Sequence, residues 1–225
     1  MNKKIVSLTV ILMSTALPIY AGGFSLPSLG SDKPAANAGD QGAAAAVMQE
    51  SVVQKYMAAS REFTTAQIEL AQAFDLKDQA AALQAQATVL GSGATLDKDG
   101  IAKQTQVSEA ADKAIQAKIG SSTEITEEGK KHYVAALSPF GRGVLQTAGM
   151  PAELTAFGNS AQAQITNAPM LEKLGVTNKF KAGLYLVKEL PGYTSRMYSS
   201  LKSVVTYGQK VGIEMPKDAT AALGN

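Results

Sequence analysis

The sequence has 225 residues, of which 45% are hydrophobic, and it carries 21 Lys and Arg against 19 Asp and Glu. This apolar content excludes a wholly disordered chain and is enough for one modest core. Because the sequence has no Cys and a single His, it excludes a disulfide-built fold and a zinc site made by Cys or several His.

The first 21 residues have the pattern of a secretory signal peptide. Lys3 and Lys4 precede an apolar run of 13 residues, and Ala21 offers a small residue for cleavage. A membrane-spanning helix needs about 20 apolar residues, so we favour cleavage near Ala21 over a retained anchor. We therefore expect the mature chain in the periplasm or outside the cell. Loss of the two lysines leaves equal numbers of basic and acidic residues, and this balance does not predict binding to nucleic acid.

Residues 22–42 are rich in Gly, Ser, Pro and Ala and show no helical or strand period, so they are predicted to form a flexible arm. The segment contains apolar Phe24, Leu26 and Leu29, which we interpret as part of a loosely tied lead-in. Residues 43–213 are expected to form a single all-α domain, and residues 214–225 a C-terminal tail.

The stretch from 43 to 90 lacks both Gly and Pro and is dominated by strong helix formers. Its larger apolar residues recur at spacings of three, four and seven, which places them on one helix face: Val53, Tyr56, Phe63, Leu70 and Phe74. One unbroken helix would be about 72 Å long, too long for a domain of this size. We expect a break at 75–78, where two Asp residues favour a cap.

The segment 91–100 is predicted to end this helix and to begin another, with Asp97 or Asp99 as the N-cap. The two helices, 43–90 and 101–119, would form a long helical hairpin. A third helix is expected to start at Ser121 or Thr126 and to kink or end near Ser138, before Pro139.

Four prolines divide the second half, so its helices are expected to be shorter. Pro151 suits the first position of one helix. Another helix should end at Pro191, and a last one should run from about Thr194 to Val211, although residues 203–207 also have strand character. The expected fold is an all-α bundle with a long hairpin and a cluster of shorter helices.

No catalytic constellation can be assembled from the sequence. Ser199 and Lys202 have the S-x-x-K spacing, but the motifs that accompany it in Ser-Lys enzymes are missing. The Asp97–Asp99 pair lacks the first and last ligands of a calcium loop, and His132 is expected on a solvated helix face. We therefore predict a non-enzymatic protein without a cofactor or a bound metal.

The last quarter of the chain is rich in residue types that are frequent at interfaces. The candidate interaction surface consists of Tyr185, Tyr193, Arg196, Tyr198 and Tyr207. On this basis the sequence predicts an interaction or adaptor protein of the cell envelope or the extracellular space, with an unknown protein or another envelope component as its partner.

Two alternatives remain. The chain could carry a small apolar ligand such as a lipid between its helices, in a cavity lined by Leu137, Phe140, Val144, Leu154, Phe157 and Leu184. It could also be a membrane-active helical protein, for which the apolar stretch 133–150 is the only support. Pro139 and Arg142 within that stretch make this the less favoured alternative.

Overall fold

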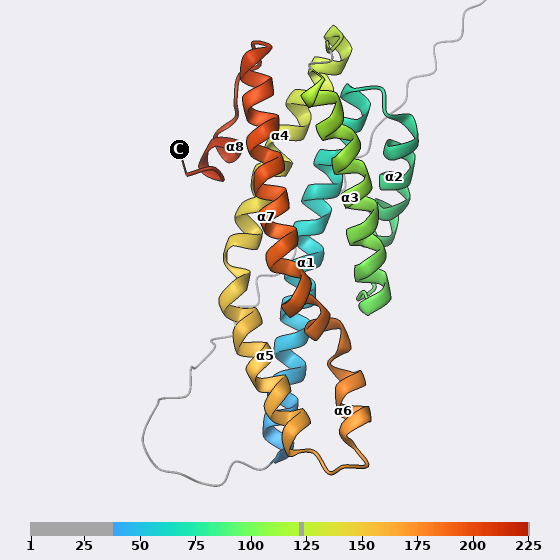
Figure 1. Cartoon of the computed structure of the whole chain (residues 1–225), viewed down its shortest axis with the longest axis vertical. Coiled ribbons are helices and arrows are strands. Elements are labelled where there is room, and N and C mark those ends of the chain that lie inside the picture. Colours follow the sequence, from blue (N-terminus) through green and yellow to red (C-terminus); the bar gives the residue numbers. More distant parts are fainter. Residues whose placement is uncertain (1–37, 122–123, 225) are drawn as a thin grey trace, which may run out of the picture. The chain divides into compact units, whose positions relative to one another are not determined.

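The computed structural model describes residues 38–121 and 124–224, so the expected signal peptide and residues 22–37 of the expected arm lie outside the described residues. In this part of the chain the structure has eight helices and no strand, which confirms the all-α prediction (Figure 1). The helices are α1 (Ala38–Ala73), α2 (Lys77–Gly91), α3 (Lys98–Gly120), α4 (Glu127–Ala148), α5 (Met150–Asn167), α6 (Lys173–Lys179), α7 (Lys181–Lys210) and α8 (Lys217–Ala221).

Helix α1 follows the predicted apolar stripe. Val53, Tyr56, Phe63, Leu70 and Phe74 are all buried in the hydrophobic core. The predicted break is confirmed, because α1 ends at Ala73, Asp75 has a φ of 53°, and α2 begins at Lys77. Helix α2 then folds back beside α1 (Figure 1).

Two side-chain caps fix where the next helices begin. Asp97 accepts a hydrogen bond of 2.8 Å from the backbone N–H of Gly100 and caps α3. Thr126 accepts one of 3.0 Å from the N–H of Gly129 and caps α4, whereas Ser121 lies at the C-terminal end of α3. Of the alternatives that the sequence left open, Asp97 and Thr126 are therefore the caps.

Two helices continue through a proline. Of the two alternatives at Pro139, a helix end is wrong, because α4 continues to Ala148. The helix end expected at Pro191 is also wrong, because α7 continues to Lys210 and is a 30-residue helix. Residues 203–207 are helical as well. A proline removes one backbone hydrogen bond, but packing of an apolar face supplies most of a helix's stability in a folded protein. Here Phe140 beyond the first proline and Tyr193 beyond the second are both buried in the core.

Helix α1 lies among the other long helices rather than in a simple hairpin. It contacts α2, α3, α4, α5 and α7, and its most extensive contact is with α4 (Figure 1). The ring of Phe63 packs edge-on against Phe140 of α4 at a centroid distance of 5.8 Å and against Tyr193 of α7 at 5.7 Å. These aromatic contacts join three helices that are distant in sequence.

The segment 214–225, expected as a C-terminal tail, contains α8, which packs on α4. Ala219 is fully buried, and the Ser138 hydroxyl donates a hydrogen bond of 2.6 Å to the Asp218 carboxylate. A side chain at Gly141 would approach the backbone oxygen of Asp218 to 2.4 Å. Helix α8 can therefore lie this close to α4 because position 141 has no Cβ.

Candidate functional site

The tyrosines of the candidate interaction surface do not share one exposed face. Tyr193 is 2% exposed and Tyr207 is 5% exposed, so these two residues belong to the core rather than to a surface. Tyr207 packs against Phe74 and Tyr133, with ring centroids 5.9 and 5.8 Å apart. Both tyrosines lie on the inward face of α7, where large side chains stabilise the bundle.

The other three members of that surface differ in their surroundings. Tyr198 is 41% exposed. Tyr185 is half-buried, with the Lys98 ammonium 5.9 Å from its ring centroid. The Arg196 guanidinium donates to the Glu109 carboxylate at 2.6 Å and lies over the Tyr193 ring. The arginine thus connects α7 to α3, and only Tyr198 keeps the exposure that an interaction surface needs.

The six residues proposed to line a ligand cavity lie in or against the hydrophobic core. Five of them are buried and Leu184 is partly buried. The Phe157 ring packs edge-on against Phe180 at 6.1 Å, as Phe140 does against Phe63. Leu154 also borders a small pocket of about 150 Å³, below the usual range of about 300 to 1,000 Å³ for ligand sites. The contacts of these side chains are those of ordinary core packing.

A buried polar layer joins α1, α3 and α7. Gln67 of α1 and Ser108 of α3 exchange two hydrogen bonds of 3.0 and 2.9 Å. The Ser200 hydroxyl of α7 donates to the Asp112 carboxylate, and burial raises the pKa of that carboxyl group. The inward face of α3 therefore meets its neighbours largely through hydrogen bonds, which fix the relative register of the helices.

His132 is half-buried rather than solvated, because its Nδ1 lies 2.7 Å from the Glu69 carboxylate of α1. Within residues 38–121 and 124–224, no three His, Asp or Glu side chains are grouped so that they could hold a metal ion. The Ser199 hydroxyl donates to the Ser195 carbonyl at 3.0 Å, which is an ordinary bond within a helix. Ser199 and Lys202 border an open groove of about 540 Å³ on α7, together with Tyr198.

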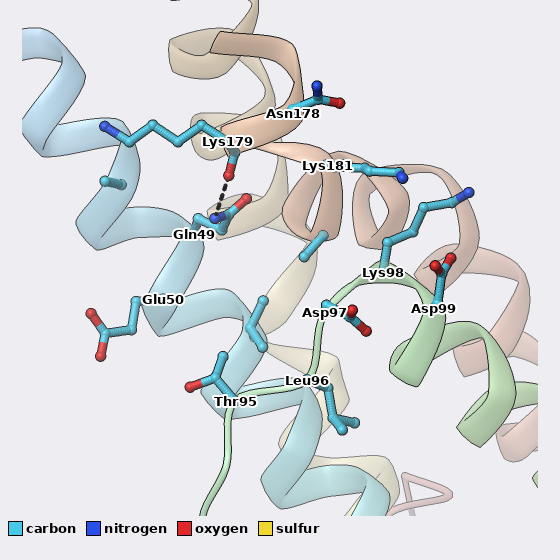
Figure 2. A pocket seen from close by; sticks show the side chains of 13 residues that line it. Gln49, Glu50, Thr95, Leu96, Asp97, Lys98, Asp99, Asn178, Lys179 and Lys181 are labelled. Carbon is cyan, nitrogen blue, oxygen red and sulfur yellow. Dashed lines mark hydrogen bonds between the residues drawn. The ribbon is translucent and has the colours of Figure 1, made fainter. Parts of the chain in front are cut away.

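A polar pocket of about 480 Å³ lies where α1, the start of α3 and the joint between α6 and α7 meet (Figure 2). Its charged lining residues are Glu50, Asp97, Lys98, Asp99, Lys179 and Lys181. Three ammonium groups and three carboxylates give this lining no excess of either charge. The Asp97 carboxylate already accepts the hydrogen bond that caps α3, and Gln49 forms hydrogen bonds with the α6–α7 joint. Part of the pocket lining therefore stabilises the fold.

The most exposed large apolar residues of the described chain lie in the turn between α5 and α6 and in the first turn of α6. Met170 is 90% exposed, Leu171 is 97% exposed and Leu174 is 74% exposed. We call these three residues the apolar tip. The turn lies at the end of the helices where α1 begins (Figure 1).

The sequence did not point to the apolar tip as a candidate site. Helix α6 begins at Lys173, after a turn in which the N–H of Glu172 donates to the Pro169 carbonyl at 2.8 Å. Met170 and Leu171 therefore belong to the turn and face away from the bundle. Two large apolar residues directly after a proline were the available signal for this turn.

No protein-family model matches this sequence, and comparisons with curated proteins and with solved structures find no match. None of the helices in the described part of the chain combines the length and the apolar character that crossing a membrane requires.

Proposed function

We propose that the chain is an exported, non-enzymatic interaction protein that docks through its apolar tip. The observation that carries this proposal is the exposure of Met170, Leu171 and Leu174, at 90%, 97% and 74%. Other large apolar side chains that are exposed on the described surface range from 39% to 64%. The tip thus differs from the scattered apolar residues that every protein surface carries.

Docking would remove this apolar surface from water. Each large apolar side chain gains about 1.5 to 3 kcal/mol when it passes from full exposure to full burial. Three neighbouring side chains can therefore provide a useful part of a binding free energy, whereas they give the isolated chain no packing energy. The cavity residues of the carrier alternative already make core contacts, so the observations favour docking over carriage of a ligand.

Site-specific photocrosslinking tests the proposal in the cells that produce the protein. A photoreactive amino acid at position 171 should yield a reproducible crosslinked product. The same probe at Val134, which is 49% exposed on α4, serves as the matched control. A crosslink at 171 and none at 134 would support docking through the tip. Equal labelling at both positions, or none at 171, would contradict it.

The export part of the proposal has its own measurement. Mass spectrometry of the periplasmic or secreted form should find a chain that begins near Gly22, after cleavage at Ala21. Recovery of only the full-length chain would contradict export with cleavage.

A further inference from the structure

We infer that the apolar tip inserts into the surface of an anionic lipid bilayer. This inference rests on the proposed docking function and names the chemistry of its partner. It depends on three features of the described residues: the position of the tip, its exposed apolar side chains, and the lysines beside it.

The tip is convex. Helix α5 ends at Asn167 and α6 begins at Lys173, so the chain reverses direction between them (Figure 1). Met170, Leu171 and Leu174, in and directly after this turn, are between 74% and 97% exposed. A protein partner would need a groove that matches this projection. A fluid bilayer needs none, because lipids rearrange around apolar side chains that enter the boundary between headgroups and acyl chains.

The charges next to the tip suit an anionic surface. Residues 169–181 contain Lys173, Lys179 and Lys181 but only one acidic residue, Glu172. All three lysines are exposed, and none of them forms a salt bridge within the part of the chain that the structure describes. The Lys179 ammonium lies 5.7 Å from the centroid of the Phe180 ring, and its side chain is still exposed. Lipid phosphates attract such exposed lysines when they lie within about a Debye length of the membrane.

The acidic residues of the polar pocket belong to other elements. Glu50 is on α1, and Asp97 and Asp99 are at the start of α3, whereas Figure 2 shows Lys179 and Lys181 on the α6–α7 joint that continues from the tip. Asp97 also accepts the capping hydrogen bond of α3. The excess of positive charge thus lies on the same segment as the exposed apolar residues. This combination is typical of peripheral membrane contacts.

The absence of Trp from the sequence allows a direct test with a single fluorescent reporter. Leu171→Trp places the only indole at the tip, and Val134→Trp places it on α4 as the matched control. Position 134 is remote from the tip: its neighbour His132 contacts Glu69, about 30 Å along α1 from Gln49, which contacts α6. Each purified full chain is titrated with vesicles of phosphatidylcholine alone and of phosphatidylcholine mixed with phosphatidylglycerol.

The expected result is a blue shift of the emission of Leu171→Trp with the anionic vesicles, and none for Val134→Trp. Adding Met170→Glu and Leu174→Glu should weaken this binding by more than about tenfold, because two apolar groups are lost from the inserted part. Lys173→Gln with Lys179→Gln and Lys181→Gln should remove the preference for anionic vesicles, as high salt should. Circular dichroism confirms that each variant keeps its helices.

Folded Leu171→Trp protein that shows no shift at millimolar lipid would overturn the inference. Equal shifts at positions 171 and 134, or equal binding to both vesicle types, would overturn it as well. If vesicles fail to bind while the crosslink at position 171 captures a protein, the docking function stands and the lipid partner is wrong. If the crosslink is also missing, both proposals fail.

Discussion

Gln49 of α1 holds the joint between α6 and α7 by bonding Lys179. Its amide nitrogen donates to the backbone carbonyl of Lys179 at 3.0 Å, and its amide oxygen accepts from the N–H of Gly183 at 3.1 Å. The first N–H groups of a helix have no partner within that helix, and α7 has no side-chain cap of its own. A side chain from another helix therefore satisfies the start of α7 and fixes the segment that carries the apolar tip.

Gln49→Ala should lower the free energy of unfolding by about 1 kcal/mol, because the mutation leaves the Gly183 N–H without its partner. Hydrogen exchange should become faster in residues 180–184. The matched control is Gln54→Ala on the same helix, where the amide bonds only the side chain of Glu50. Equal losses for the two variants would show that the bridge to α6 and α7 adds nothing to stability.

Phe63→Ala should destabilise the protein by about 3 to 5 kcal/mol. The ring is 0% exposed and packs against Phe140 and Tyr193, so its removal leaves a cavity where three helices meet. Urea denaturation followed by circular dichroism measures the change. Val134→Ala, at an exposed site on α4, should stay within about 0.5 kcal/mol of the parent. A loss below about 1 kcal/mol for Phe63→Ala would contradict the register of α1.

Gly143→Ala should destabilise the protein, although alanine normally stabilises a helix relative to glycine by about 1 kcal/mol. A Cβ at position 143 would lie 2.7 Å from the Phe63 ring, which Phe140 and Tyr193 hold from other sides. Overpacking of this kind costs about 1 to 3 kcal/mol. Gly192→Ala on α7 is the control, because a Cβ there meets nothing within 4 Å. Stabilisation by both substitutions would contradict the close contact.

The sequence predicted the parts of the fold that depend on local pattern. The apolar stripe of α1, the break near Asp75 and the cap at Asp97 follow from helical periodicity and from the preference of Asp for helix ends. It was wrong about a helix end at Pro191, and at Pro139 the alternative of a helix end was wrong, because local propensity alone favours an end at proline. Packing of Phe140 and Tyr193 against α1 outweighs that propensity, and such contacts between distant segments cannot be read from a single sequence.

The candidate site was harder to predict for a related reason. Tyr193 and Tyr198 are five residues apart on α7, yet one is buried and the other exposed, because their side chains point to different faces of the helix. The exposure of Leu171 depends on where the turn after α5 ends, and a shift of that boundary by a few residues would bury or expose it. Composition alone does not show which of these large side chains are buried and which are exposed.

Asp112 of α3 is 6% exposed and accepts a hydrogen bond from Ser200 of α7. Burial raises the pKa of this carboxyl group in the folded protein above its ordinary value of 3.8, while the bond from Ser200 acts in the opposite direction. The folded chain therefore keeps the proton to a higher pH than the unfolded chain does. The stability contributed by the protonated group is complete below 3.8 and is lost as the pH rises through the raised pKa.

Asp112→Asn should remove this loss of stability at higher pH, because the amide is neutral at every pH and still offers an oxygen to Ser200. Urea denaturation between about pH 3 and pH 7 should show the variant gaining stability relative to the parent as the pH rises. Ser200→Ala should act in the opposite sense, since it removes a donor that stabilises the ionised carboxylate, and its cost should be larger at about pH 7 than at about pH 3. A stability difference between Asp112→Asn and the parent that does not change with pH would show that burial does not perturb this carboxyl group.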